Sequence, residues 1–160
     1  MKNGISTHLN NDLPVGVEGD FASTNPYYSV LAGEGQIKAG DQGVIVGSFA
    51  WFDPETGLAT NTKVANGLIG FVRRDNTALL NEYLAESSLT IPKGFIVTLY
   101  DGGDFWARFA GGANIGQKVF ASTANGSVAA ADTAPAGYEE TGFIVASKAE
   151  AGALAKISKH

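Results

Sequence analysis

The stretch FIVTLYDGGDFWARFA, Phe95–Ala110, carries the clearest structural signal in the sequence. Two runs rich in aromatic and β-branched residues, Phe95–Tyr100 and Phe105–Ala110, flank the tetrapeptide Asp101–Asp104. Such runs are typical of β-strands, and paired glycines suit a two-residue turn because glycine adopts positive φ without steric cost. The stretch therefore predicts an antiparallel β-hairpin with its turn at Gly102-Gly103.

Similar runs occur on both sides of this stretch and are separated by turn signals. Asn125-Gly126 is the strongest of these signals, and Asp53–Gly57 has the composition of a longer hairpin loop. The other expected strands are Val44–Phe52, Leu58–Val64, Leu68–Arg74, Lys118–Thr123, Ser127–Ala131, Thr141–Ala149 and Ala153–Ser158. About eight short antiparallel strands predict a mostly β fold, a jelly-roll-like β-sandwich that leaves few strand edges exposed.

One segment departs from the β pattern. Between Asn76 and Ala85, leucine and tyrosine side chains recur at three- and four-residue spacing, and Asp75 or Asn76 can cap the free amides. The spacing predicts one short helix over residues 76–85. A helix of about ten residues is marginal in water, so we expect it to pack on the sheet or on a partner.

The first thirty residues have a different character from the rest. Residues 1–30 are rich in Asn, Gly, Ser and Thr, and Pro14 and Pro26 oppose a helix there. We expect an extended N-terminal arm over residues 1–30, followed by a single β-sandwich domain over residues 31–160. A frayed terminus is the alternative interpretation of the same composition.

Composition excludes several classes of function. The 160 residues include no cysteine and carry a formal net charge of −5. Thiol chemistry is therefore excluded, we expect no metal site and no cofactor, and the scattered Lys and Arg residues form no basic stripe for nucleic acid. The sequence shows neither a signal peptide nor a membrane-spanning run. We expect a soluble protein that is made in the cytosol and binds neither nucleic acid nor membrane.

The residues that could support catalysis are few. Histidine occurs only at His8, in the expected arm, and at His160, the last residue, so neither is placed to act as a tuned base. Asp101 and Asp104 bracket the glycine pair, where turn chemistry accounts for them. Glu139 and Glu140 are adjacent on an expected strand and should point to opposite faces. The sequence therefore predicts that the chain is not an enzyme.

Aromatic side chains offer candidate contact residues instead. Strand alternation places Phe105 and Phe109 on one face, as core residues, and Trp106 with Arg108 on the other. Tryptophan beside arginine is a combination enriched at protein interfaces, and Trp51 could act similarly. The residues proposed to contact a partner are Phe21, Tyr27 and Tyr28 of the arm, together with Trp106 and Arg108.

Several segments give the chain a likeness to a known family. They are Gly19-Asp20, GLIGFVRRD (Gly67–Asp75), IPKGFIVTLYDGGDFWARF (Ile91–Phe109), ANIGQKVFAS, ANGSV and ETGFIVASKAEAGALAKIS. In these segments the sequence resembles the head decoration, or cement, proteins of tailed bacteriophages. The resemblance implies a β-sandwich that binds the outside of the assembled capsid and clamps neighbouring major capsid protein subunits together. It also implies a homodimer or homotrimer.

We therefore expect a structural protein on the outer capsid surface of the virion, with the major capsid protein and further copies of itself as partners. The competing hypothesis is a carbohydrate-binding β-sandwich on a virion or cell surface. In that case Trp51 or Trp106 would provide the stacking platform for sugars.

Overall fold

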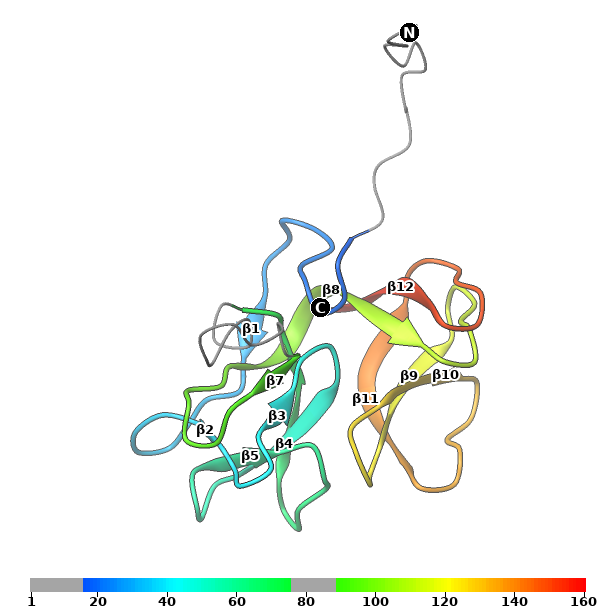
Figure 1. Cartoon of the computed structure of the whole chain (residues 1–160). Helices are drawn as coiled ribbons and strands as arrows, with labels where there is room; N and C mark the ends of the chain where they lie inside the picture. Colours follow the sequence, from blue (N-terminus) through cyan, green and yellow to red (C-terminus); the bar gives the residue numbers. More distant parts are fainter. Residues whose placement is uncertain (1–15, 76–88) are drawn as a thin grey trace, which may run out of the picture.

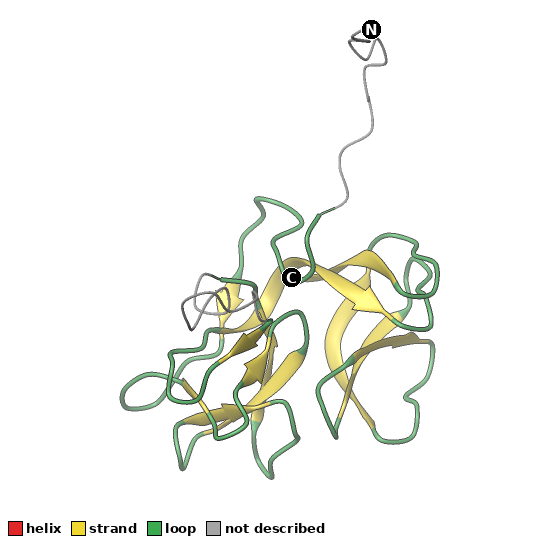
Figure 2. Ribbon diagram, viewed as in Figure 1, coloured by secondary structure: helices red, strands yellow, loops and turns green. Residues whose placement is uncertain are grey.

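A computed structural model describes residues 16–75 and 89–160 of the chain. This part consists of strands and loops, with no helix within it (Figure 2). The strands are β1 (Tyr28–Ser29), β2 (Lys38–Ala39), β3 (Val44–Ile45), β4 (Phe49–Asp53), β5 (Leu58–Thr60), β6 (Leu68–Val72), β7 (Thr90–Ile91), β8 (Leu99–Phe109), β9 (Lys118–Ser122), β10 (Val128–Ala131), β11 (Tyr138–Val145) and β12 (Ala153–Lys159). The mostly β fold is confirmed, and the helix predicted over residues 76–85 lies outside the described residues.

Ten strands form one open sheet, in the order β10-β9-β11-β12-β8-β6-β4-β5-β2 with β1 joined to β8, and β3 pairs with β7 separately. All of these pairings are antiparallel except that of β2 with β5. β8 runs from the half of the molecule that contains β2–β7 to the half that contains β9–β12 (Figure 1). The expected antiparallel pairing is thus confirmed for all but one pair, while the jelly-roll-like sandwich stays a prediction.

The hairpin predicted at Gly102-Gly103 is wrong, because Leu99–Phe109 forms the single strand β8. Tyr100 and Phe105 nevertheless belong to the same core, with ring centroids 5.3 Å apart. In a straight strand, residues five apart lie about 17 Å apart and point to opposite faces. β8 therefore bends sharply at the glycine pair, where Gly103 has φ 124°. The glycines permit a bend within a strand instead of a chain reversal.

The glycine pair also lets another segment approach closely. A Cβ atom on Gly102 would overlap the ring of Tyr28, and one on Gly103 would lie 2.8 Å from the Cβ of Tyr27. Tyr28 pairs with Gly102 in the β1–β8 ladder, whose register shifts between Tyr28 and Ser29. Side chains at positions 102 and 103 would thus displace both tyrosines from β8.

Of three further expectations, one is wrong and two are confirmed. Val44–Phe52 does not form one strand, because the chain turns at Gly47 (φ 76°) and Ser48 Oγ donates a hydrogen bond to the Ile45 carbonyl over 2.6 Å. The hairpin loop at Asp53–Gly57 is confirmed: β4 pairs with β5, and Gly57 has φ 72°. The hairpin around Asn125-Gly126 is confirmed by the pairing of β9 with β10.

The hydrophobic interior comprises two clusters on opposite faces of β4. Phe49 and Trp51 belong to the cluster shared with β8, β9, β11 and β12, and Ala50 and Phe52 belong to the cluster shared with β3 and β7. These four successive residues are all buried, as expected for a strand covered on both faces. Because successive β4 residues belong to the two clusters in turn, β4 lies between the clusters and contributes to both.

Asn61 fixes the start of β4 through polar contacts, next to a hydrogen bond that links the two halves. Its Oδ1 accepts a hydrogen bond from the Ile45 amide over 2.7 Å, and its Nδ2 donates to Ser48 Oγ and to the Phe49 carbonyl, each over 2.8 Å. The Phe49 amide in turn donates to the Gly126 carbonyl over 2.9 Å. The β9–β10 hairpin is thus fixed against the start of β4.

Replacing Gly102 by Ala tests the close approach of the tyrosine. We expect Gly102→Ala to lower the free energy of unfolding by about 1–3 kcal/mol, because the new methyl group overlaps the Tyr28 ring. Urea unfolding measures the effect. Gly33→Ala is the matched control and should be neutral, since nothing lies within 4 Å of its Cβ position. In a Tyr28→Ala background the penalty should shrink, and an unchanged penalty would contradict the account.

A second prediction concerns Asn61 and the start of β4. Asn61→Ala should lower the free energy of unfolding by about 2–3 kcal/mol, because it leaves the Ile45 amide and the Phe49 carbonyl without their side-chain partner. Thr133→Ala, in an exposed turn, is the control. Equal stability of the two variants in thermal unfolding would rule out the role given to Asn61.

Candidate functional site

Residues 16–30, called here the N-terminal segment, lie along β8. Phe21 pairs with Phe105 and Ser29 with Tyr100, so the segment runs antiparallel to the strand. Tyr100 also pairs with Phe71 of β6, and Phe105 with Ile157 of β12. Since a strand residue has one neighbour on each edge, the segment occupies the edge of β8 that β6 and β12 leave free.

Phe21 attaches the N-terminal segment to the core. Its ring is stacked on Phe105 with centroids 5.3 Å apart, and it meets Tyr100 edge-on at 5.8 Å. The guanidinium carbon of Arg73 lies 4.4 Å from the centre of the same ring. Phe21 is therefore half-buried within its own chain, where aromatic pairs of this geometry stabilise packing beyond the area they bury.

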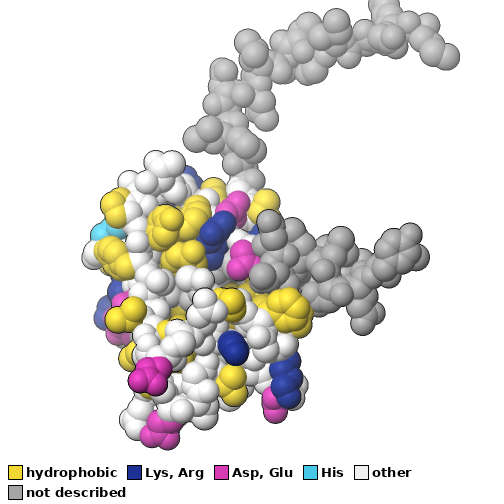
Figure 3. Space-filling view, turned by 90° about the vertical axis from the view of Figure 1, so that its left-hand side faces the viewer, with side chains coloured by type: hydrophobic (Ala, Val, Ile, Leu, Met, Phe, Trp, Pro, Cys, Tyr) yellow, Lys and Arg dark blue, Asp and Glu magenta, His cyan; other side chains and the backbone are white. Residues whose placement is uncertain are grey.

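Tyr27 and Tyr28 stand at the surface of the same segment, with 56% and 48% of their areas exposed. Tyr27 packs against Phe21 at 4.7 Å and against Tyr100 at 5.7 Å, while Tyr28 lies over Gly102. Each ring thus has one side held by the protein and another open to solvent. Figure 3 shows hydrophobic side chains gathered on the upper part of the face that carries β1.

Trp106 and Arg108 lie on the opposite face of β8 from Phe105 and Phe109, as the alternation predicted. The Lys156 ammonium is 5.2 Å from the centre of the Trp106 ring, and Gly16 lies directly against the indole. Arg108 Nε donates to Glu18 Oε2 over 2.7 Å, and its Nη1 donates to the Gly152 carbonyl over 2.7 Å. Both side chains therefore have partners within this chain.

The structure thus brings all five proposed contact residues to one place, β8 and the N-terminal segment. Phe21, Trp106 and Arg108 fix the segment to the strand, and Tyr27 and Tyr28 are the exposed aromatic members. Their role toward a partner stays a prediction. The expectation of an arm over residues 1–30 also stays a prediction, since residues 1–15 lie outside the described part.

Leu31 and Leu68 are exposed hydrophobic residues that the sequence interpretation missed. Leu31 is 87% exposed and Leu68 is 47% exposed. With Ser29, Val30, Ile69 and Asp101 they line a shallow hollow of about 300 Å³ next to β1. Strand propensity gave no signal for them, because leucine within or near a strand run is ordinarily a core residue.

Trp51 cannot provide a platform for sugars, because it is fully buried. Its Nε1 donates a hydrogen bond to Glu139 Oε2 over 3.1 Å, and that carboxylate also pairs with Lys63 at 3.2 Å. Glu140 pairs instead with Lys118. The suggestion that Trp51 is an interface or stacking residue is therefore wrong, and the two glutamates do not share a site.

Asp104 has a role that turn chemistry did not predict. Its Oδ2 accepts hydrogen bonds from Ser23 Oγ (2.5 Å) and Asn25 Nδ2 (2.7 Å), and His160 Nε2 lies 3.0 Å from its Oδ1. Burial acts to raise the pKa of Asp104, but hydrogen bonds from Ser158, Ser23 and Asn25 and the charge of His160 outweigh it, so the pKa lies below its usual value. The carboxylate holds the N-terminal segment on β8.

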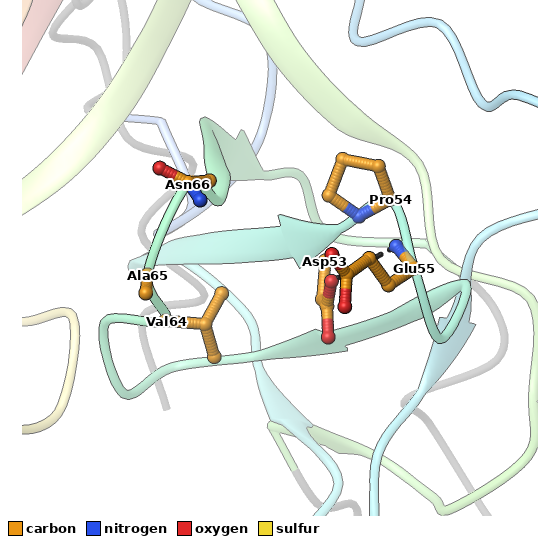
Figure 4. Close-up of a pocket in the computed structure, with 6 residues that line it drawn as sticks. All are labelled: Asp53, Pro54, Glu55, Val64, Ala65 and Asn66. Atoms are coloured by element: carbon orange, nitrogen blue, oxygen red, sulfur yellow. Dashed lines mark hydrogen bonds between the residues drawn. The ribbon is translucent and has the colours of Figure 1, made fainter.

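A hollow of about 540 Å³ lies between the β4–β5 turn, at Asp53–Glu55, and the loop at Val64–Asn66 (Figure 4). The Asp53 carboxylate is already engaged in the turn, since it accepts hydrogen bonds from the Glu55 amide and from Thr56 Oγ1, each over 2.9 Å. No cluster of three or more His, Cys, Asp or Glu side chains fit for a metal ion occurs within residues 16–75 and 89–160. The same residues include no helix long and apolar enough to span a membrane.

The lowered pKa of Asp104 predicts a pH dependence. In the unfolded chain an aspartate titrates near pH 3.9, above the folded value. The stability that the carboxylate contributes is thus fully present above about pH 4 and is lost as the pH falls through the folded pKa. Asp104→Asn should be less stable than the parent by about 1–3 kcal/mol at pH 7, with the difference shrinking below about pH 4. Urea unfolding from pH 7 to pH 2.5 measures it.

Asp41→Asn is the control for this experiment. The pKa of Asp41 is also lowered, mainly by a hydrogen bond from Lys93, but both side chains are exposed. Because exposed ion pairs contribute little to stability, this variant should stay close to the parent over the whole pH range. A difference between parent and Asp104→Asn that stays constant over the whole pH range would contradict the role assigned to Asp104.

Comparisons with known proteins agree with the picture of a capsid-associated protein. No curated protein matches the chain. A solved structure described as "The capsid of Myoviridae Phage XM1" contains a chain that is 14% identical, with a TM-score of 0.63, over 94% of this chain and 93% of that one. At this identity the likeness concerns the fold alone. The family model for the XM1 gp53 minor capsid protein matches residues 5–159. The chain belongs to the XM1 gp53 minor capsid protein family.

Proposed function

We propose that this minor capsid protein is a non-enzymatic decoration, or cement, protein, which binds the outer surface of the assembled capsid and stabilises it by bridging major capsid protein subunits. Its membership of a phage minor capsid family supports a place in the virion. The observation that carries the proposal is the pair of half-exposed tyrosines, Tyr27 and Tyr28, on a segment fixed to β8.

The two tyrosines have the properties of interface anchors. Tyrosine offers a large apolar ring with a polar tip and is enriched in protein–protein interfaces. Here the rings of Phe21 and Tyr100 pack against the Tyr27 ring, and the Tyr28 ring packs against Gly102. Because both rings are already positioned, docking costs less conformational entropy than it would for a free segment. Leu31 and Leu68 extend the exposed apolar area beside them.

The remaining proposed contact residues act by holding this surface in place. Phe21 packs on the core, Trp106 packs against Gly16, and Arg108 pairs with Glu18, so each fixes one part of the N-terminal segment. Loss of any of them would weaken capsid binding through the position of the tyrosines.

A capsid surface presents the same docking position many times. Repeated sites let a modest interface act with high avidity, and a homodimer or homotrimer would bridge several subunits at once. The net charge of −5 disfavours contact with nucleic acid or with an anionic membrane. We therefore place the protein on the outside of the shell, with the major capsid protein and its own copies as partners.

Binding to shells assembled without this protein tests the proposal. The parent protein should sediment with assembled shells and should bind isolated major capsid subunits far more weakly. Tyr27→Ser combined with Tyr28→Ser should weaken shell binding by about tenfold or more, since tyrosine is enriched among the interface residues whose truncation costs over about 1 kcal/mol.

Ile115→Ser is the matched control, because Ile115 is 70% exposed but lies in the loop between β8 and β9, away from the N-terminal segment. Urea unfolding must show that all variants are folded. Equal binding of the parent to shells and to isolated subunits would refute a cement function, and unchanged binding of the double variant would refute the tyrosine surface.

A further inference from the structure

The ten-stranded sheet has two end strands, β2 and β10, which differ in their outer edges. The outer edge of β2 is covered by residues 94–97: the Ala39 amide donates to the Phe95 carbonyl over 2.8 Å, and the Val97 amide donates to the Ile37 carbonyl over 2.9 Å. Within the described part of the chain, no strand pairs with the outer edge of β10. β10 is therefore an end strand whose outer edge carries no ladder among the described residues, although β8 packs close to it.

The direction of the free backbone groups follows from the ladder. The Ser122 amide donates to the Ser127 carbonyl over 2.9 Å, so these opposed residues form a hydrogen-bonded pair. Hydrogen-bonded and non-hydrogen-bonded pairs alternate along an antiparallel ladder. Ala129 is thus bonded to Phe120 of β9, and the amides and carbonyls of Val128 and Ala130 point to the outer edge.

The composition of β10 offers none of the usual protection of an edge strand. Natural sheets block their edges with charged side chains, proline or bulges, which prevent another strand from pairing there. β10 has the sequence Val-Ala-Ala-Ala, in regular register with β9 throughout. An unprotected edge of this kind is a template for one more strand.

A groove of about 530 Å³ runs beside this edge. Its lining includes Val128 and Ala129 of β10, Ile45 of β3, Tyr138, and Arg108 and Glu18, which form an ion pair. A strand residue occupies about 160 Å³ of a sheet, given a rise of 3.4 Å, a strand spacing of 4.8 Å and a sheet spacing of 10 Å. The groove therefore has room for a single extended segment of about three residues.

We propose that β10 and this groove receive an extended segment of the major capsid protein, which adds to the sheet as a further strand. An extended polypeptide is the ligand whose alternating N–H and C=O groups match those of Val128 and Ala130. Ile45, 45% exposed, offers an apolar contact to its side chains. The inference rests on the capsid binding proposed above and names a second, backbone-mediated contact.

Ala130→Pro tests this proposal with shells assembled without the minor capsid protein as the probe. The substitution removes the amide at the outer edge and no hydrogen bond to β9, so the variant should fold and bind shells about tenfold more weakly. Ala129→Lys fills the groove without a proline and should have the same effect. Ala136→Lys, in the exposed turn between β10 and β11, is the matched control and should bind as the parent does.

Hydrogen exchange gives a second readout. In the free protein the Ala130 amide should exchange fast and the Ala129 amide slowly, and on shells the Ala130 amide should become protected. Parent protein that binds shells with Ala130 unprotected and Ala130→Pro binding unchanged would overturn this inference and leave the proposed function intact. Concentration-dependent protection of Ala130 in the free protein would overturn it in favour of a second copy. Failure of the parent to bind shells would overturn the proposed function itself.

Discussion

The bend of β8 at Gly102-Gly103 is the constraint on which the rest of the structure depends. Without it, Tyr100 and Phe105 would point to opposite faces, and the two halves of the sheet would not share one core. The same absence of side chains lets Tyr28 lie directly on the strand. One pair of glycines thus joins the two halves of the molecule and determines where the N-terminal segment is bound.

That segment shows how stability and recognition are combined in one surface. The segment forms backbone hydrogen bonds with β8 and so covers a strand edge on which another chain could otherwise pair. Phe21 and the Asp104 carboxylate fix the segment from the core side and from the polar side. The tyrosines follow these two attachments along the segment, and Tyr28 itself pairs with Gly102 of β8. They are consequently presented in a fixed position, which is what a surface that must fit a rigid shell requires.

The two surfaces proposed to meet the capsid use different physics. The tyrosine surface offers apolar area, with specificity from shape and from the phenol groups. The edge of β10 offers backbone hydrogen bonds. These require an extended conformation of the partner and depend little on its sequence. Backbone hydrogen bonds from Phe49 to Gly126 and from Lys63 to Thr123 hold the β9–β10 hairpin against the other half. Both surfaces therefore keep a fixed relation to each other within one protein.

The sequence by itself determined the β class, the hairpin at Asn125-Gly126, the loop at Asp53–Gly57 and the inward and outward alternation of Phe105–Phe109, because these depend on neighbours a few residues apart. Only the tertiary structure decided the use of Gly102-Gly103, since a glycine pair permits a turn and a bend equally well, and residues 16–30 select the bend by lying against it. Burial of Trp51, exposure of Leu31 and the open edge of β10 were likewise decided by which strands meet, a long-range property that local patterns do not encode.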